Sequence, residues 1–334
     1  MKKLLISMLA VATLASCAKE ETLSFDKGEA IQFGNAFVDN ATRATDPSYS
    51  ANDIDSFKVY GTVNGVNIYN GNVVSRPSAV AGEGYGDVWT CTGTQQYWIA
   101  GAQYKFVGIV DGDKAGVTET TVVNGMPTAI KYTADGKTDL LCQTIDRTAK
   151  TDGTDNDIVA FNFTHLLSKV NFTVVNGSKD ATGYSFVVKS ITFKGATEAT
   201  YDVVNAKWND ATATGDTVIG NERTVNSSTV KDIVVATSAA SAELGTEVLF
   251  IPGTYTISFT VDILYNGVPV TTNNYPVTGK TYTHTLKAAN SYNFKVNVSV
   301  GKPIQFTVTE QPAWDGDATT PGIQDGYNDT TLTL

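Results

Sequence analysis

Arginine is rare in this chain, and one arginine lies where a protease could cleave. The arginines are Arg43, Arg76, Arg147 and Arg223. Arg43 stands in NATRATDPSY (40–49), a polar segment with small neighbours and a nearby Pro47, which is typical of accessible backbone. A trypsin-like protease recognises a single basic side chain on accessible backbone of this kind. We therefore predict a scissile bond between Arg43 and Ala44.

Cys17 is the second residue with chemistry of its own. It follows Lys2, Lys3 and the apolar stretch Leu4–Leu14, which has the length of a signal-peptide core. A membrane span would need roughly 20 apolar residues. Because LASC (14–17) resembles a bacterial lipobox, we predict that residues 1–16 are a lipoprotein signal peptide and that Cys17 carries acyl chains. The alternative is a plain secretory signal with an incidental cysteine.

The sequence offers little for catalysis. Its histidines are His165 and His284, and neither belongs to a recognised nucleophile, metal or phosphate motif. Aromatic side chains can form carbohydrate platforms, but in strand-rich proteins they mostly fill cores. We therefore predict no enzymatic activity and no cofactor, and packing roles for Trp89, Trp98, Trp208 and Trp314.

Metal binding and disulfide formation each have one candidate set. Asp152, Asp155 and Asp157 lie in TDGTDNDI (151–158) and could contribute oxygens to a calcium site, although an exposed acidic loop needs no metal. Cys91 and Cys142 could form one disulfide after export or remain two free, buried thiols. The sequence leaves both alternatives open.

The charge of the chain excludes some partners. The formal net charge is −10, and removal of residues 1–16 with Lys2 and Lys3 makes it −12. An acidic chain repels phosphate backbones and anionic headgroups. We therefore predict no nucleic-acid partner, and attachment to a membrane through the lipid on Cys17 alone.

Strands must position these residues, because short alternating runs separated by turns fill the chain after residue 28. In SYNFKVNVSV (291–300), apolar and polar residues alternate as in a half-buried strand. VNGVN (63–67) and YNGVP (265–269) contain Asn-Gly steps that are typical of hairpins. The pattern predicts an all-β fold, as two antiparallel β-sandwich domains in tandem over residues 44–160 and 161–314.

Both ends of the exported chain read as single strands. Residues 17–43 would be a propeptide in which Ile31, Phe33 and Phe37 share the buried face of a strand. This strand would plug a groove of the first sandwich until cleavage at Arg43. Residues 315–334 would be an extended arm, with Tyr327, Leu332 and Leu334 as its bulky residues. At roughly 3.3 Å per residue, the arm could reach a neighbouring copy.

The chain resembles the fimbrillin family of the Bacteroidales. The resemblance rests, beside Cys17, on IQFGNAF and TRAT (within 31–45), FTHLLSKVNFTV (163–174), LFIPGTY (249–255), LKAANSYNFKVNVSV (286–300) and IQFTVTEQPAWDG (304–316). The segment KAANSY departs from the pattern, because a glycine is expected before the aromatic strand. AKEE (18–21) is similar to an export tag of surface lipoproteins.

The resemblance implies two transthyretin-like sandwich domains and a structural subunit of a cell-surface fimbria, or pilus. It matches Cys17 to the lipidated cysteine, Arg43–Ala44 to the scissile bond, and Tyr327, Leu332 and Leu334 to the donor segment for strand exchange. Implied partners are copies of the chain, other fimbrial subunits, an arginine-specific protease and the outer membrane. The alternative is a non-polymerising surface lipoprotein: a glycan-binding module or adhesin, or a fimbrial tip or anchor subunit.

Overall fold

The structure is a computed structural model of the 334-residue chain. It describes residues 28–38, 54–76, 89–110, 116–152, 157–177, 183–219, 221–225, 228–235, 241–243, 247–275, 282–299, 303–312 and 323–331.

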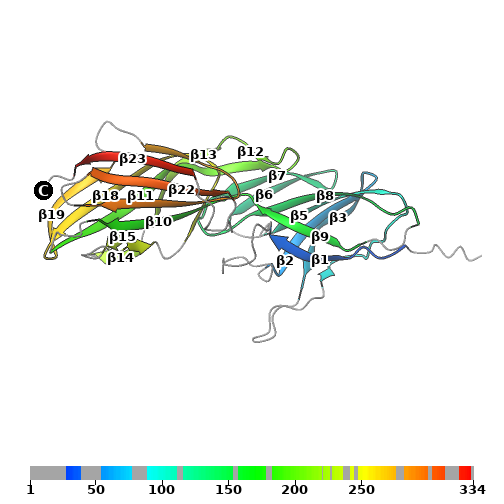
Figure 1. Ribbon diagram of the computed structural model, residues 1–334. Coiled ribbons are helices and arrows are strands. Elements are labelled where there is room, and N and C mark those ends of the chain that lie inside the picture. Colours follow the sequence, from blue (N-terminus) through cyan, green and yellow to red (C-terminus); the bar gives the residue numbers. More distant parts are fainter. Residues whose placement is uncertain are drawn as a thin grey trace, which may run out of the picture.

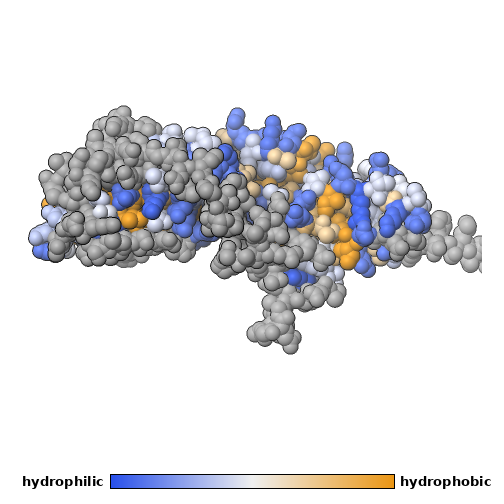
Figure 2. Space-filling model, viewed as in Figure 1, coloured by the Kyte–Doolittle hydropathy of each residue, from blue (hydrophilic) through white to orange (hydrophobic). Residues whose placement is uncertain are grey.

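The prediction of an all-β fold is confirmed, because every regular element of the described residues is a strand. These strands form three sheets in an elongated molecule (Figure 1). Helices long and apolar enough to cross a membrane do not occur in the described segments. Figure 2 shows hydrophobic side chains gathered on one face over the end that holds the first sheet.

The first sheet has seven strands and lies toward one end of the molecule (Figure 1). Its spatial order is β1 (Phe33–Val38), β9 (Val159–His165), β8 (Leu141–Thr148), β5 (Gln103–Val110), β2 (Ser56–Val63), β3 (Val66–Ser75) and β4 (Thr90–Cys91). All neighbouring strands are antiparallel except β1 and β9, which run parallel.

The second sheet has ten strands and is built around β11 (Tyr184–Asp202). Its main path is β14 (Asn221–Val225), β15 (Ser228–Val235), β11, β18 (Gly253–Tyr265) and β19 (Val268–Tyr275). β11 also pairs with β12 (Lys207–Trp208), β13 (Ala213–Ile219) and β7 (Met126–Thr133), and β18 also pairs with β20 (Tyr282–Leu286). In turn, β7 pairs with β6 (Val117–Val123).

The third sheet has six strands. Its path is β16 (Ser241–Glu243), β10 (Ser168–Asn176), β21 (Asn290–Val298), β22 (Pro303–Pro312) and β23 (Ile323–Thr331), and β17 (Val248–Phe250) also pairs with β10. Here β10 and β21 run parallel over their whole length. The sheets therefore contain two parallel pairs, β1 with β9 and β10 with β21, where only antiparallel pairs were expected, and each of these pairs joins strands distant in sequence.

Two apolar clusters form the interior. The smaller one lies against the first sheet and includes Phe33, Phe106, Phe161 and Phe163. The larger one lies between the second and third sheets and includes Phe172 among many others. Along β9 and β21 the buried residues alternate with more exposed ones, as the period of a pleated strand requires, whereas β5 and β10 carry longer buried runs.

The expected boundary between residues 160 and 161 does not coincide with a change of sheet. Phe161 and Phe163 lie in the smaller cluster on β9, and the chain enters the third sheet only at Ser168. In addition, β7 of the first half pairs with β11 of the second. Alternation alone could not assign Phe161 and Phe163, because it shows that a strand is half-buried and not which sheet it joins.

Hairpin turns are formed by the Asn-Gly steps themselves. Asn64–Gly65 and Asn266–Gly267 have positive φ at both residues, as a type I′ turn requires. Asn124–Gly125 repeats this conformation between β6 and β7. Ala206 and Ala289 also have positive φ, and Ala289 occupies the turn in KAANSY where a glycine is expected.

Candidate functional site

Residues 29–38, called the N-terminal segment below, have their backbone held on both sides. On one side β1 pairs with β9, and Val159 N donates to Gln32 O at 2.8 Å. On the other side, Ile31 N donates to Gln96 O at 2.9 Å, and Trp98 N donates to Glu29 O at 2.8 Å. The segment therefore fills a slot between β9 and residues 95–98. Without it, these backbone groups would lose their partners.

The side chains of this segment fill the same slot. Ile31, Phe33 and Ala36 are 3%, 6% and 3% exposed. The ring of Phe33 lies 5.3 Å from that of Tyr69 and 5.8 Å from that of Phe106, both in edge-to-face geometry. Each large side chain that is buried stabilises the fold by about 1.5–3 kcal/mol.

The register of β1 shifts between Gly34 and Phe37. Such an irregularity interrupts the simple alternation that placed Ile31, Phe33 and Phe37 on one face. Ala36 is buried, and the backbone of Phe37 is aligned with Asn162 of β9. The side chain of Phe37 lies outside the described part of the structure.

Two predicted modification sites lie outside the described residues. These are Cys17 and the bond between Arg43 and Ala44. The described part of β1 ends at Val38, five residues before Arg43 in the sequence. Lipidation and cleavage therefore stay predictions.

The C-terminal strand folds back on its own sheet. β23 pairs antiparallel with β22, from Glu310 opposite Ile323 to Pro303 opposite Thr331. The strand thus begins well before TTLTL (330–334), and Tyr327 is aligned with Phe306. Leu332 and Leu334 lie outside the described residues. The expected arm is a paired edge strand here, because its polar residues still supply backbone donors and acceptors for a ladder.

A buried histidine–carboxylate pair lies where β8 begins and β9 ends. His165 Nδ1 lies 2.6 Å from Asp139 Oδ2, and both side chains are almost fully buried. Burial together with pairing satisfies two polar groups that would be costly alone. The pair gives His165 a structural role, which the sequence motifs left open.

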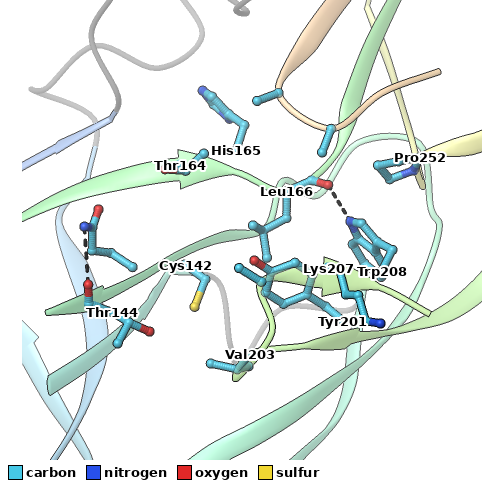
Figure 3. Close-up of a pocket in the computed structure, with 14 residues that line it drawn as sticks. Cys142, Thr144, Thr164, His165, Leu166, Tyr201, Val203, Lys207, Trp208 and Pro252 are labelled. Atoms are coloured by element: carbon cyan, nitrogen blue, oxygen red, sulfur yellow. Dashed lines mark hydrogen bonds between the residues drawn. The ribbon is translucent and has the colours of Figure 1, made fainter. Parts of the chain in front are cut away.

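Cys142 lies on β8, the strand next to that of His165, but does not form a catalytic pair with it. Cys142 is aligned with Thr164 on β9, so its side chain leaves the opposite face from His165 (Figure 3). Burial raises the pKa of the Cys142 thiol to about 12, which keeps it protonated at neutral pH.

Both cysteines after Cys17 are free thiols. Cys142 belongs to the larger apolar cluster, and Cys91 packs against the smaller one. Burial raises the pKa of Cys91 to about 11. The alternative of a disulfide between them is therefore wrong for this structure.

The acidic candidates for calcium do not gather into a site within the described chain. Asp157 forms an ion pair with Arg147 at 3.3 Å and is largely exposed. Asp155 lies outside the described residues, while Asp152 is in the turn after β8. No cluster of three or more His, Cys, Asp or Glu side chains that could hold a metal occurs among the residues described.

A buried glutamate on β22 holds the turn between β20 and β21. Glu310 Oε1 accepts hydrogen bonds from Lys287 Nζ at 2.9 Å and Asn290 Nδ2 at 2.5 Å. Burial alone would raise the pKa of Glu310, but these bonds outweigh burial and lower it below its usual value. The carboxylate is therefore charged at neutral pH and anchors the turn.

The family model described as "Fimbrillin-like" matches residues 42–312, which is most of the chain. The chain belongs to the fimbrillin-like family. No curated protein is similar enough in sequence to count as a match.

Solved structures similar to this fimbrillin-like chain come from related proteins. A fimbrial protein from Bacteroides vulgatus ATCC 8482 is 15% identical with a TM-score of 0.53, over 73% of this chain and 88% of that one. This likeness supports the shared β fold. A putative cell adhesion protein from Bacteroides uniformis ATCC 8492 is 18% identical with a TM-score of 0.44, over 86% and 99% of the two chains.

A third similar structure is the fimbrial anchor protein Mfa2 from Porphyromonas gingivalis. It is 14% identical with a TM-score of 0.36, over 81% of this fimbrillin-like chain and 90% of that one.

Sequence reasoning missed the residues that hold the N-terminal segment from its second side. Gln95 and Gln96 lie in a stretch without alternation, so no pattern marked this stretch as a partner of the segment, and Trp98 was predicted only to pack. Asp139 and Glu310 were also missed, since a single acidic residue in a strand-rich sequence has no periodic signal. Only the unusual alanine in KAANSY pointed to its turn.

Proposed function

We propose that this chain is a structural subunit of a cell-surface fimbria that polymerises by strand exchange. An arginine-specific protease would cut between Arg43 and Ala44 and release the preceding strand. The observation that carries the proposal is the slot between β9 and residues 95–98, which the N-terminal segment fills with backbone and side chains alike.

Release of the segment would create an acceptor groove. Gln96 O, Trp98 N and the edge of β9 would lose their partners, and the aromatic rings around Phe33 would face an apolar gap. Unpaired strand edges over apolar pockets accept a strand from another chain. The uncut precursor would stay monomeric, because its own strand occupies the groove.

The donor would be the C-terminal strand of a neighbouring copy. β23 is held by a single ladder to β22 among the described strands, so its release costs the pairing along one edge. A head-to-tail exchange does not close on itself and therefore builds a fibre. Tyr327, Leu332 and Leu334 would be the residues of the donor that enter the groove.

The location proposed for the chain is the outer face of the outer membrane. The lipid on Cys17 would hold the precursor there, and cleavage after Arg43 would free the subunit from its anchor. The partners would be copies of the chain and other fimbrial subunits.

A second candidate function is that of a non-polymerising surface lipoprotein, such as a tip or anchor subunit or a binding module. The observation in its favour is the extended ladder between β22 and β23, which occupies the strand that a stalk subunit would donate. A subunit that keeps both terminal strands in place could end a fibre without continuing it.

The test is the state of the chain at the cell surface in variants of Arg43. Arg43→Ala should leave a folded, uncut monomer, whereas wild-type protein should start at Ala44 and form SDS-resistant ladders. Arg43→Lys keeps the charge and is the matched control, since an arginine-specific protease would leave it uncut as well. Normal fibres of uncut Arg43→Ala protein would contradict the activation scheme.

Deletion of residues 323–334 tests the role of the C-terminal donor strand separately from cleavage at the N-terminal segment. The expected product is a cleaved monomer whose groove stays empty. Ladders that persist in this variant would exclude β23 as the donor. Wild-type protein that keeps its lipidated Cys17 on mature fibres would favour the tip or anchor alternative.

A further inference from the structure

A cavity of about 670 Å³ opens at the junction of the three sheets. Its walls come from β8, β9 and the turns that precede β12 and β21. Figure 3 shows Trp208 and Lys207 on one side of it and Thr144 on the other, with Leu166 and Tyr201 between them. This volume lies within the range that small-molecule sites occupy.

Backbone strain is concentrated at this cavity. The non-glycine residues with positive φ in the described chain are three asparagines in Asn-Gly hairpins and two alanines, Ala206 and Ala289. Asparagine tolerates this conformation, but alanine adopts it at a cost. Both alanines line the cavity, from two different turns. Strained backbone persists only where the surrounding structure holds it in place, and it is found most often at functional sites such as ligand sites.

Each strained turn is held by a carboxylate behind it. Asp202 accepts hydrogen bonds from Val204 N at 3.0 Å and from Asn205 N at 2.9 Å, which fixes the turn with Ala206. Glu310 fixes the turn with Ala289 through Lys287 and Asn290. These hydrogen bonds hold both turns of the cavity wall in their left-handed conformation.

The aromatic wall is oriented as well. Trp208 Nε1 donates to Leu166 O at 2.7 Å, and its ring packs edge-to-face on those of Tyr201 and Tyr132. The Trp208 side chain nevertheless remains partly exposed at the cavity. A half-covered indole that is already oriented offers a flat apolar surface and loses little side-chain entropy when a ligand binds.

Polar groups complete the cavity. Lys207 is exposed beside Trp208, and it interacts electrostatically with Asp202 without a direct ion-pair contact among the described residues. Gln143, Thr144 and Thr164 add an amide and two hydroxyls at the other side. Asp202, which is aligned with Lys207 across β11 and β12, attracts the lysine electrostatically and also accepts the hydrogen bonds of its own turn.

We propose that this cavity binds an acidic sugar, that is, a pyranose of one or two units that carries a carboxylate. The apolar face of the ring would lie on Trp208, the carboxylate would pair with Lys207, and ring hydroxyls would bond to Thr144 and Thr164. A single lysine at the cavity can pair with one carboxylate, whereas the net charge of −10 on the chain would repel a polyanion. This inference does not depend on polymerisation.

The test uses glucuronic acid and glucose as probes of the full chain, in saturation-transfer NMR titrations to about 20 mM, where weak sugar binding is still measurable. Glucuronic acid should bind more tightly than glucose. Lys207→Ala should weaken glucuronic acid binding about tenfold and leave glucose unchanged. Lys137→Ala removes an exposed lysine outside the cavity and is the matched control.

A second variant tests whether the sugars bind in this cavity without changing the charge of the protein. Ala288 is an exposed residue of the cavity wall, so Ala288→Phe should retain the fold and block both sugars. The proposal is overturned if neither sugar binds, if glucose binds as well as glucuronic acid, or if Ala288→Phe leaves binding intact. An equal loss in Lys137→Ala would also overturn it, because the effect would then be one of general charge.

Discussion

Ala289 adopts a backbone conformation, with φ of 57°, that alanine rarely occupies. Its amide donates to Leu167 O at 2.9 Å, and its turn is anchored by Glu310 through Lys287 and Asn290. These contacts hold the residue in place against its own preference. At the scale of single residues, the chain therefore stores strain at a defined position, and glycine would remove it.

We predict that Ala289→Gly raises the free energy of unfolding by about 0.5–1 kcal/mol. Relief of the left-handed conformation contributes about 1–2 kcal/mol, and the greater freedom of glycine in the unfolded chain offsets part of it. Ala288→Gly is the control, because Ala288 lacks a positive φ and should lose stability. Urea unfolding of both variants measures the difference, and equal losses would show that Ala289 is unstrained.

The N-terminal segment is held as firmly as an internal strand. Its backbone bonds to β9 and to residues 95–98, and its apolar side chains enter the smaller cluster. By contrast, β23 is paired along one edge. At the scale of elements, the first strand is thus the one whose removal would leave the larger defect. This difference is why proteolysis, and not spontaneous opening, is proposed as the trigger.

Phe33→Ala should lower the free energy of unfolding of the uncut chain by about 3–5 kcal/mol, the range for loss of a buried aromatic ring. Gln32→Ala alters an exposed neighbour and should change stability by less than about 0.5 kcal/mol. Chemical denaturation measures both values. A small effect for Phe33→Ala would mean that the segment does not belong to the core.

The N-terminal and C-terminal halves of the chain share a sheet and the larger apolar cluster. β7 comes from the first half and pairs with β11 of the second, and its residues Ile130 and Tyr132 are buried in the larger cluster. Tyr60, Val107 and Ile109 of the first sheet belong to that cluster as well. At the scale of the whole molecule, the larger core therefore extends into strands of both halves, which favours unfolding as one cooperative unit.

Ile130→Ala should lower the protection of both halves by the same amount, about 2–5 kcal/mol. Hydrogen exchange followed by mass spectrometry can compare peptides from β5 with peptides from β18. Glu119→Ala, an exposed change on the adjacent strand β6, should leave exchange unaltered. Loss of protection confined to one half would show that the two unfold independently.

Local patterns predicted much of this structure. Alternation identified the half-buried strands, and Asn-Gly steps identified hairpin turns such as Asn64–Gly65. The missing glycine in KAANSY marked a turn that proved to be strained. These features depend on neighbours in sequence, which is why periodicity and turn chemistry reveal them.

The sequence by itself determined the strand content, the hairpins and the family to which the chain belongs. The tertiary structure alone decided which strands became neighbours: the parallel pair of β1 and β9, the sharing of β7 with β11, and the return of β23 to β22. It also decided that Ala206 and Ala289 meet at one cavity. The physical reason is that strand pairing joins backbone groups common to all residues, so the partner is selected by burial across the whole fold.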